Sequence, residues 1–213
     1  MPPQPHVFLL PGWLDSGPSH WQSRWQARYG YTRVEQHDWQ RPLRGDWLAR
    51  LDEVIANHLN ALNTLSNTQQ LTLSNKGLAA SYPPKSTPAA PNIVLVAHSL
   101  GCHLVAAWAA ASRHRAAVRG ALLVAPPDLT QADLPPDLVN WRKPVLQALP
   151  FPAICIVSSN DPFGRLNAGR AMATAWGARC VEAGPLGHIN GDSGLGDWPA
   201  GHAMVLDLMG SQI

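Results

Sequence analysis

The chain has 213 residues, a length that predicts one domain, and we expect residues 1–213 to fold together as that domain. Hydrophobic residues make up 46% and charged residues only 14%, which excludes a charge-rich disordered tail and a coiled coil. The formal net charge is +2 and the Lys and Arg residues are scattered, so the sequence predicts no nucleic-acid partner.

Short apolar runs rich in branched residues predict six β-strands, at 6–10, 31–35, 93–97, 121–125, 153–157 and 179–183. Several of these runs are continuously apolar, which is typical of strands buried on both faces of a parallel sheet. Segments with helical spacing alternate with these strands. We expect helices around Trp21 and Trp25, from an N-cap at Asp46, directly after the third strand, over residues 166–176, and from Asp197 onward. This alternation predicts an α/β fold, a three-layer α/β/α sandwich with a mostly parallel six-stranded sheet.

The segment 64–91 interrupts the pattern, because it is rich in Ser, Thr, Asn and Pro and shows little periodicity. We expect a flexible insertion there, forming a mobile surface loop of the same domain. The other connections after the strands are expected to be short, so the sequence predicts no large cap domain. The site would then be shallow and covered only by this insertion and by nearby tryptophans.

The sequence predicts neither a disulfide nor a bound cofactor. Its three cysteines, Cys102, Cys155 and Cys180, are widely spaced, and we expect all of them to be small buried core residues. His98 and His103 do not share a helix face, so we expect no metal site, and no phosphate-binding or dinucleotide motif occurs. We find no secretory signal and no apolar run long enough to span a membrane, and we expect a cytoplasmic location.

Ser99 is the candidate nucleophile. It lies within Ala97-His98-Ser99-Leu100-Gly101, between the third predicted strand and an apolar helix, which is the pattern of a nucleophile elbow. Small residues two positions before and after the serine allow the tight turn to pack against its neighbours. The alternative is a serine that only caps the helix.

A serine nucleophile needs a base and an orienting acid, and in this type of fold they follow in the order acid, then histidine. Asp161 follows the fifth predicted strand and His188 follows the sixth, so each stands after the carboxyl end of a strand. Taken singly, each has an alternative role, as a turn residue or as an exposed loop residue. Asp128, after the fourth strand, is the best alternative acid. The order of all three residues predicts a catalytic triad of Ser99, Asp161 and His188.

Acyl transfer also requires N–H groups that stabilise the developing oxyanion. The backbone N–H of Leu100, directly after the nucleophile, is one predicted donor. The loop after the first strand contains Pro11-Gly12-Trp13, and the backbone N–H of Trp13 is the predicted second donor. An ordinary Pro-Gly turn is the alternative there.

Several motifs together resemble a known family: Pro11-Gly12-Trp13 with His20-Trp21, Ala97-His98-Ser99-Leu100-Gly101, Asn160-Asp161-Pro162, and Gly187-His188-Ile189-Asn190 continuing to Ser193-Gly194-Leu195-Gly196-Asp197-Trp198-Pro199. By these motifs, nearly the whole chain resembles the small α/β-hydrolase-fold serine hydrolases of the retinoblastoma-binding type. The resemblance implies a triad at Ser99, Asp161 and His188 and a compact sandwich without a large lid. The sequence departs from the family at Pro11, where many hydrolases carry His, and in the 64–91 insertion.

The predicted function is hydrolysis of small carboxylic esters, with thioesters or amides as the alternative substrates, through an acyl-enzyme on Ser99. The implied partner is a small-molecule acyl substrate. The alternative is a binding or interaction protein that keeps the fold with little or no turnover. Dehalogenase-like chemistry is disfavoured, because it needs Asp at position 99.

Overall fold

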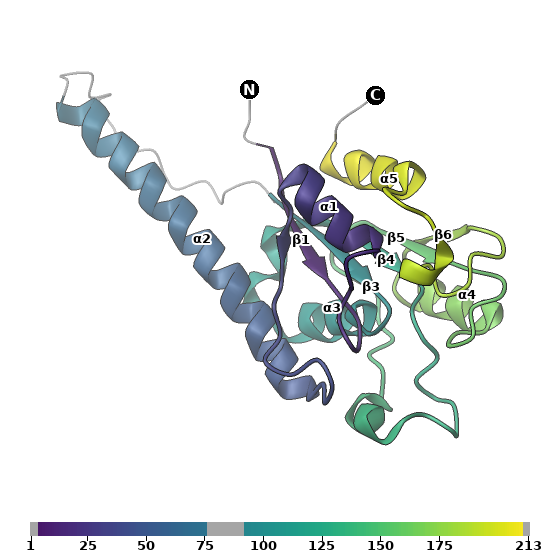
Figure 1. Cartoon of the computed structure of the whole chain (residues 1–213). Helices are drawn as coiled ribbons and strands as arrows, with labels where there is room; N and C mark the ends of the chain where they lie inside the picture. Colours follow the sequence, from purple (N-terminus) through teal and green to yellow (C-terminus); the bar gives the residue numbers. More distant parts are fainter. Residues whose placement is uncertain (1–3, 76–91, 211–213) are drawn as a thin grey trace.

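The computed structural model describes residues 4–75 and 92–210, which form a six-stranded sheet in the order β2-β1-β3-β4-β5-β6 (Figure 1). The strands are β1 His6–Leu10, β2 Thr32–Arg33, β3 Ile93–His98, β4 Val118–Val124, β5 Ala153–Val157 and β6 Arg179–Glu182. Every neighbouring pair of strands is parallel. The predicted parallel sheet is confirmed, and the candidate nucleophile follows an interior strand.

Helices cover both faces of the sheet. They are α1 Trp21–Tyr29, α2 Arg44–Asn75, α3 Leu100–Ala111, α4 Leu166–Ala175 and α5 Pro199–Met209, with the 3-10 turns η1 Arg113–Ala117, η2 Pro136–Trp141 and η3 Gly191–Ser193. Apolar residues of α2, α3 and α4 form one buried cluster against the sheet, and those of α1 and α5 form a second on the opposite face. The predicted α/β/α layering is therefore confirmed.

The interior strands β1, β3, β4 and β5 are mainly apolar because both of their faces are buried. Along β1, Phe8 and Leu10 belong to the first cluster, whereas Val7 and Leu9 belong to the second. This alternation follows from the two-residue period of side chains on a strand. Leu10 pairs with Ala97, so β1 ends one residue short of the end of β3 at His98. The loop after β1 is thereby brought beside the turn after β3.

The expected insertion at 64–91 differs from the structure over its first part. Helix α2 continues as far as Asn75. No Gly or Pro occurs between Asp46 and Asn75, so nothing in the backbone chemistry ends the helix earlier. Residues 76–91 lie outside the described residues. The helix also begins at Arg44, which places Asp46 inside the first turn rather than at the N-cap.

The prediction that all three cysteines are buried is wrong for Cys180. Cys102 and Cys155 are buried, but Cys180 is exposed. The reason is strand order: β6 lies at the edge of the sheet, and most of its residues are exposed. A thiol on an interior strand would be covered on both sides.

The prediction of short connections is wrong between Val124 and Ala153, where β4 and β5 are joined by a long segment that includes η2.

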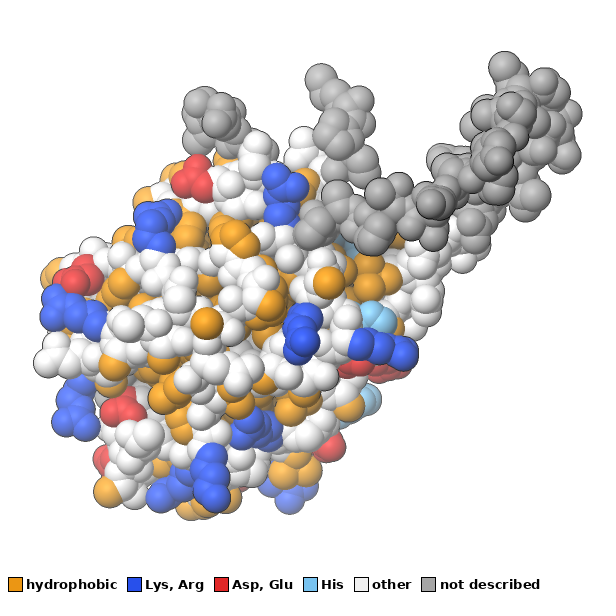
Figure 2. Space-filling model, turned by 180° about the vertical axis from the view of Figure 1, so that it is seen from behind, with side chains coloured by type: hydrophobic (Ala, Val, Ile, Leu, Met, Phe, Trp, Pro, Cys, Tyr) orange, Lys and Arg blue, Asp and Glu red, His pale blue; other side chains and the backbone are white. Residues whose placement is uncertain are grey.

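On the face seen in Figure 2, Lys and Arg side chains lie scattered among apolar and uncharged groups. Across residues 4–75 and 92–210, no helix combines the length and the apolar character needed to cross a membrane.

Candidate active site

Ser99 stands in a sharp turn between β3 and α3. Its backbone has φ 53° and ψ −123°, a conformation that a residue with a side chain rarely adopts. The Ser99 N–H donates to the carbonyl of Val124 at 2.9 Å, which ties the turn to β4. The side chain makes no capping hydrogen bond to α3. The hydroxyl is therefore held at the end of the sheet and is not used as a helix cap.

Two glycines allow this turn to pack closely. A Cβ on Gly101 would come within 2.9 Å of the carbonyl oxygen of Pro11, and still closer to that of Leu10. A Cβ on Gly12 would lie 2.7 Å from the Cβ of Ser99. Both distances are shorter than a side chain tolerates, so the loop after β1 contacts the serine turn only because glycine occupies both positions.

The structure brings Asp161 and His188 together with Ser99. Nε2 of His188 lies 2.9 Å from Oγ of Ser99, and Nδ1 lies 2.9 Å from both carboxylate oxygens of Asp161. The side chains of His188 and Asp161 are only 9% and 3% exposed. Since a carboxylate accepts hydrogen bonds, Nδ1 carries the proton and Nε2 is free to accept the serine proton.

Hydrogen bonds between the loops after β5 and β6 fix the acid relative to the histidine. The Asn160 side chain accepts from the N–H of Gly187 at 2.7 Å, and the Ser158 hydroxyl accepts from the N–H of Leu186 at 3.0 Å. Asp161 also accepts from the N–H of Phe163 at 2.9 Å. These contacts orient the carboxylate before any substrate binds.

The alternative acid, Asp128, has other partners. Its Oδ1 accepts from the backbone N–H of Thr130 at 3.0 Å and from the Thr130 hydroxyl at 2.6 Å. Oδ2 lies 3.7 Å from the guanidinium of Arg165. The hydrogen bonds of His188 therefore select Asp161 over Asp128.

The predicted oxyanion donors border the same space. Leu100 is the first residue of α3, so its N–H has no acceptor one turn earlier in the helix. Trp13 adjoins Gly12, and its indole N–H donates to the carbonyl of Gln40 at 2.7 Å, which fixes the residue in place. Both residues line the pocket that contains Ser99. Their role as donors stays a prediction.

Two further histidines pack beside the site. The ring of His98 lies 4.8 Å from that of His188 and 4.6 Å from that of His20, measured between centroids. Burial, with the nearby charge of Arg33, lowers the pKa of His20 to about 3. Burial also holds the pKa of His98 well below its usual value. Both rings are therefore neutral at physiological pH.

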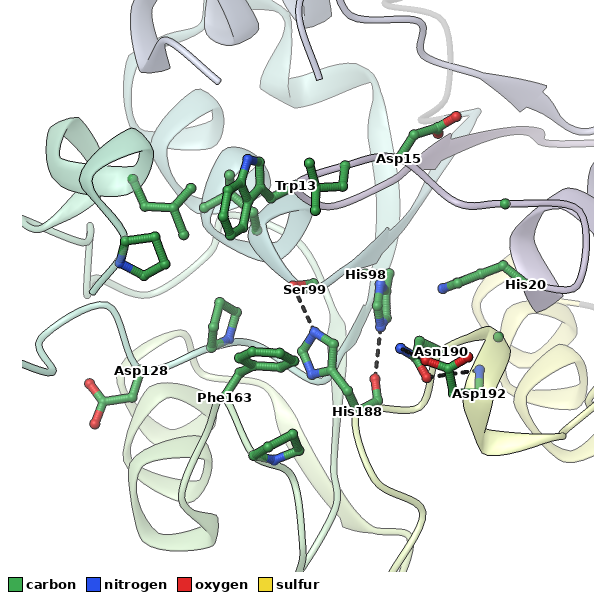
Figure 3. A pocket seen from close by; sticks show the side chains of 18 of the residues that line it. Trp13, Asp15, His20, His98, Ser99, Asp128, Phe163, His188, Asn190 and Asp192 are labelled. Atoms are coloured by element: carbon green, nitrogen blue, oxygen red, sulfur yellow. Dashed lines mark hydrogen bonds between the residues drawn. The ribbon is translucent and has the colours of Figure 1, made fainter. Parts of the chain in front are cut away.

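The pocket around Ser99 has a volume of about 590 Å³, which is in the range of small-molecule sites. Figure 3 shows Trp13 on one side of Ser99, and His20, Asn190 and Asp192 on the other. Apolar side chains gather on the side with Trp13, where Asp128 also lies, and the opposite side carries polar groups. The pocket can thus hold a substrate with one apolar and one polar part.

The apolar wall includes residues that the sequence reasoning missed, namely Pro127, Leu134, Pro135, Leu138 and Phe163. Most of them come from the long connection between β4 and β5. The sequence predicts a site covered only by the 64–91 segment and nearby tryptophans, and this prediction is incomplete because it leaves out the wall from the β4–β5 connection. The clustered prolines at 126–127 and 135–136 were the available signal that this connection has a defined shape.

Among the described residues, no group of three or more His, Cys, Asp or Glu side chains could hold a metal ion.

Comparisons with known proteins show the family and the fold of the chain. A family model described as "Serine hydrolase" matches residues 7–65 and 84–207. No curated protein matches the chain. Among solved structures, a YdeN-like hydrolase from Pectobacterium atrosepticum is 23% identical, with 97% of this chain and 91% of that chain covered and a TM-score of 0.69.

Two further solved structures have a similar fold. The ydeN gene product of B. subtilis is 18% identical, with coverage of 97% of this chain and 99% of that chain and a TM-score of 0.62. An esterase from a Rhodococcus species is 14% identical, with coverage of 98% and 91% and a TM-score of 0.60. At these identities the likeness concerns the fold, and it confirms the predicted α/β-hydrolase architecture.

Proposed function

Because the chain belongs to the serine hydrolase family, whose family model matches most of its residues, we propose that it hydrolyses small carboxylic esters through an acyl-enzyme on Ser99. Thioesters and amides are related substrates of the same chemistry. The observation that carries the proposal is the 2.9 Å contact between Oγ of Ser99 and Nε2 of His188, with Asp161 on the other ring nitrogen. We further propose that it is a cytoplasmic, single-domain member of the retinoblastoma-binding group, on the motifs described above.

The first half-reaction forms the acyl-enzyme. Oγ of Ser99 attacks the substrate carbonyl while its proton passes to Nε2 of His188. The Asp161 carboxylate stabilises the resulting imidazolium. Backbone N–H groups of Trp13 and Leu100 donate to the oxyanion of the tetrahedral intermediate. When that intermediate collapses, the bond to the leaving group breaks, and His188 donates its proton to the departing oxygen.

The second half-reaction uses the same groups on water. Nε2 of His188 removes a proton from water, and the hydroxide formed attacks the acyl carbonyl. Collapse of the second intermediate breaks the bond to Oγ and returns the proton to Ser99. The carboxylic acid leaves and the starting state is restored.

The shape of the pocket supports a substrate with a modest apolar group. Trp13, Leu134 and Leu138 belong to the same apolar cluster, and all three line the pocket. An apolar acyl or alcohol group would remove this surface from water, which favours binding in proportion to the area buried. The polar end of the substrate, which carries the ester's other substituent, would stay in contact with solvent.

Turnover of a series of p-nitrophenyl esters, from acetate to decanoate, tests the proposal. Wild-type protein is expected to release p-nitrophenolate with saturable kinetics, and Ser99→Ala is expected to reduce the rate to that of the buffer. Ser112→Ala is the matched control, because Ser112 is a buried serine that caps η1 away from the pocket. Rates at the level of the buffer for both wild type and Ser99→Ala would favour the alternative, a binding protein with little or no turnover, and equal rates above that level would reject Ser99 as the nucleophile.

A further inference from the structure

The histidine loop contains a strained residue next to the candidate base. Ile189 has φ 48° and is fully buried. A β-branched residue rarely adopts this left-handed conformation, because its side chain crowds the backbone. Such a conformation persists only where the surroundings hold it. Groups outside the loop must therefore fix the peptide units on either side of this residue.

Two donors from other elements hold these peptide units. Nε2 of His98 lies 2.9 Å from the carbonyl oxygen of His188, and the indole N–H of Trp21 donates to the carbonyl of Ile189 at 2.8 Å. His98 is the last residue of β3 and Trp21 is the first of α1. The loop is thereby attached both to the strand that carries the nucleophile and to a helix on the second face of the sheet. Figure 3 shows the His98 contact beside the Ser99–His188 contact.

The hydrogen bond to the His188 carbonyl shows which ring nitrogen of His98 carries a proton. A carbonyl oxygen only accepts, so Nε2 of His98 must carry the proton and donate it. The neighbouring His20 has the same tautomer, because its Nδ1 accepts from the N–H of Gln22 at 3.1 Å. Burial holds the pKa of His98 well below its usual value, so His98 is a neutral ring, and it packs between His20 and His188. It donates to the base residue's backbone without placing a second positive charge beside the imidazolium.

We propose that His98 is a positioning residue, whose Nε2–H holds the His188 backbone so that the His188 ring bridges Asp161 and Ser99. This inference rests on the proposed function, and it assigns a role that the triad alone does not require. His188 makes hydrogen bonds at 2.9 Å on both sides of its ring. A backbone shift of about 1 Å would lengthen at least one of them beyond a good hydrogen bond, and misplacement of that size can cost about 100-fold in rate.

Two substitutions at His98 separate the hydrogen bond from the volume of the ring. In His98→Gln the amide nitrogen is as many bonds from the backbone as Nε2, so the donor is kept. His98→Met keeps a comparable volume without a donor. We expect kcat for an ester to fall by about 10- to 100-fold in His98→Met with KM nearly unchanged, and by less than about threefold in His98→Gln. Labelling of Ser99 by a fluorophosphonate should slow in parallel.

A buried histidine elsewhere supplies the matched control. His103 lies in α3, its Nε2 contacts the Pro127 carbonyl at 2.8 Å, and its ring packs on Trp176 rather than on the histidine loop. His103→Met is expected to lower thermal stability, and since Pro127 belongs to the pocket wall it can change KM, while kcat stays within about threefold of wild type. A purely structural role for His98 predicts that the two variants behave alike in both measurements.

The outcomes distinguish this inference from the proposed function. Equal kcat and equal labelling rates in wild type and folded His98→Met would overturn the positioning role and leave the serine chemistry standing. Equal losses in His98→Gln and His98→Met would overturn it as well, because the donor would then be irrelevant. Absence of Ser99 labelling in wild type would instead reject the proposed function. If His98→Met does not fold, His98→Asn replaces it, since its amide is one methylene too short to reach the carbonyl.

Discussion

The Cα of Gly12 lies so close to Ser99 that a methyl group on it would come within 2.7 Å of the serine Cβ and 3.1 Å of Oγ. The loop that carries one predicted oxyanion donor and the turn that carries the nucleophile are therefore in direct contact. This contact sets the distance between Oγ and the backbone of Trp13. In the proposed mechanism, the oxyanion of the tetrahedral intermediate would lie between these two groups.

Gly12→Ala is predicted to separate these two segments. Either Ser99 leaves its position against His188 or the Trp13 backbone moves outward, and both changes should reduce kcat by about 100-fold. Gly45→Ala is the control, because a Cβ on Gly45 meets nothing within 4 Å. Ester hydrolysis by the two purified variants checks this. Wild-type activity in Gly12→Ala would contradict the close contact.

Asp161→Asn is predicted to preserve the shape of the site and to reduce kcat by about 10⁴-fold. The amide offers His188 an N–H where the carboxylate offered an acceptor, which favours the wrong imidazole tautomer and removes the charge that stabilises the imidazolium. Asp128→Asn should retain most of the activity, because Asp128 bonds to Thr130 and not to His188. Steady-state kinetics of both variants decide between the two acids, and the reverse ranking would refute the choice of Asp161.

Leu134→Trp is predicted to shorten the preferred apolar group of the substrate. Leu134 lines the pocket from the connection between β4 and β5, so a larger side chain would occupy space that a long chain needs. KM should rise several-fold for p-nitrophenyl octanoate and change little for the acetate. If KM depends on acyl-chain length as it does in wild type, the apolar group of the substrate does not bind against Leu134.

The buried histidines are predicted to make the fold sensitive to mild acid. Burial lowers the pKa of His103 from 6.5 to about 4. Between these values the unfolded chain binds a proton that the folded chain does not, so stability falls as the pH drops below about 6.5 and levels off near 4. The slope for one such group is on the order of 1.4 kcal/mol per pH unit.

Urea unfolding at pH 7 and at pH 4.5 measures this effect. His103→Gln has no titrating ring, so the free energy of unfolding should fall less between the two pH values than it does in wild type. His20, with a pKa of about 3, adds a similar contribution in both proteins. Parallel pH profiles for wild type and His103→Gln would show that His103 does not titrate as proposed.

Local patterns in the sequence were sufficient to predict most of the fold. Continuous apolar runs predicted strands buried on both faces, because that burial leaves no polar alternation. The serine turn was predictable, since its strand, its small flanking residues and its helix are adjacent in sequence. Asp161 and His188 could be placed because parallel strands end at one edge of the sheet.

Other features depend on contacts between distant segments, and the sequence does not encode them locally. Cys180 is exposed because its strand lies at the sheet edge, and strand order is not visible in an apolar run. The wall containing Leu134 and Leu138 comes from a connection with little periodicity. The His98–His188 contact requires a specific loop conformation around Ile189 and one histidine tautomer. These three features can be recognised only in the packed structure.

The most direct test of the central claim is peptide mapping by mass spectrometry after reaction with a fluorophosphonate. Attack by Ser99 forms an oxygen–phosphorus bond and expels fluoride, and His188 accepts the serine proton. We predict a single adduct on the peptide that contains Ser99 in native protein, and no adduct in Ser99→Ala or in heat-denatured protein. An adduct on another residue, or equal labelling of Ser99→Ala, would contradict the assignment of Ser99 as the nucleophile.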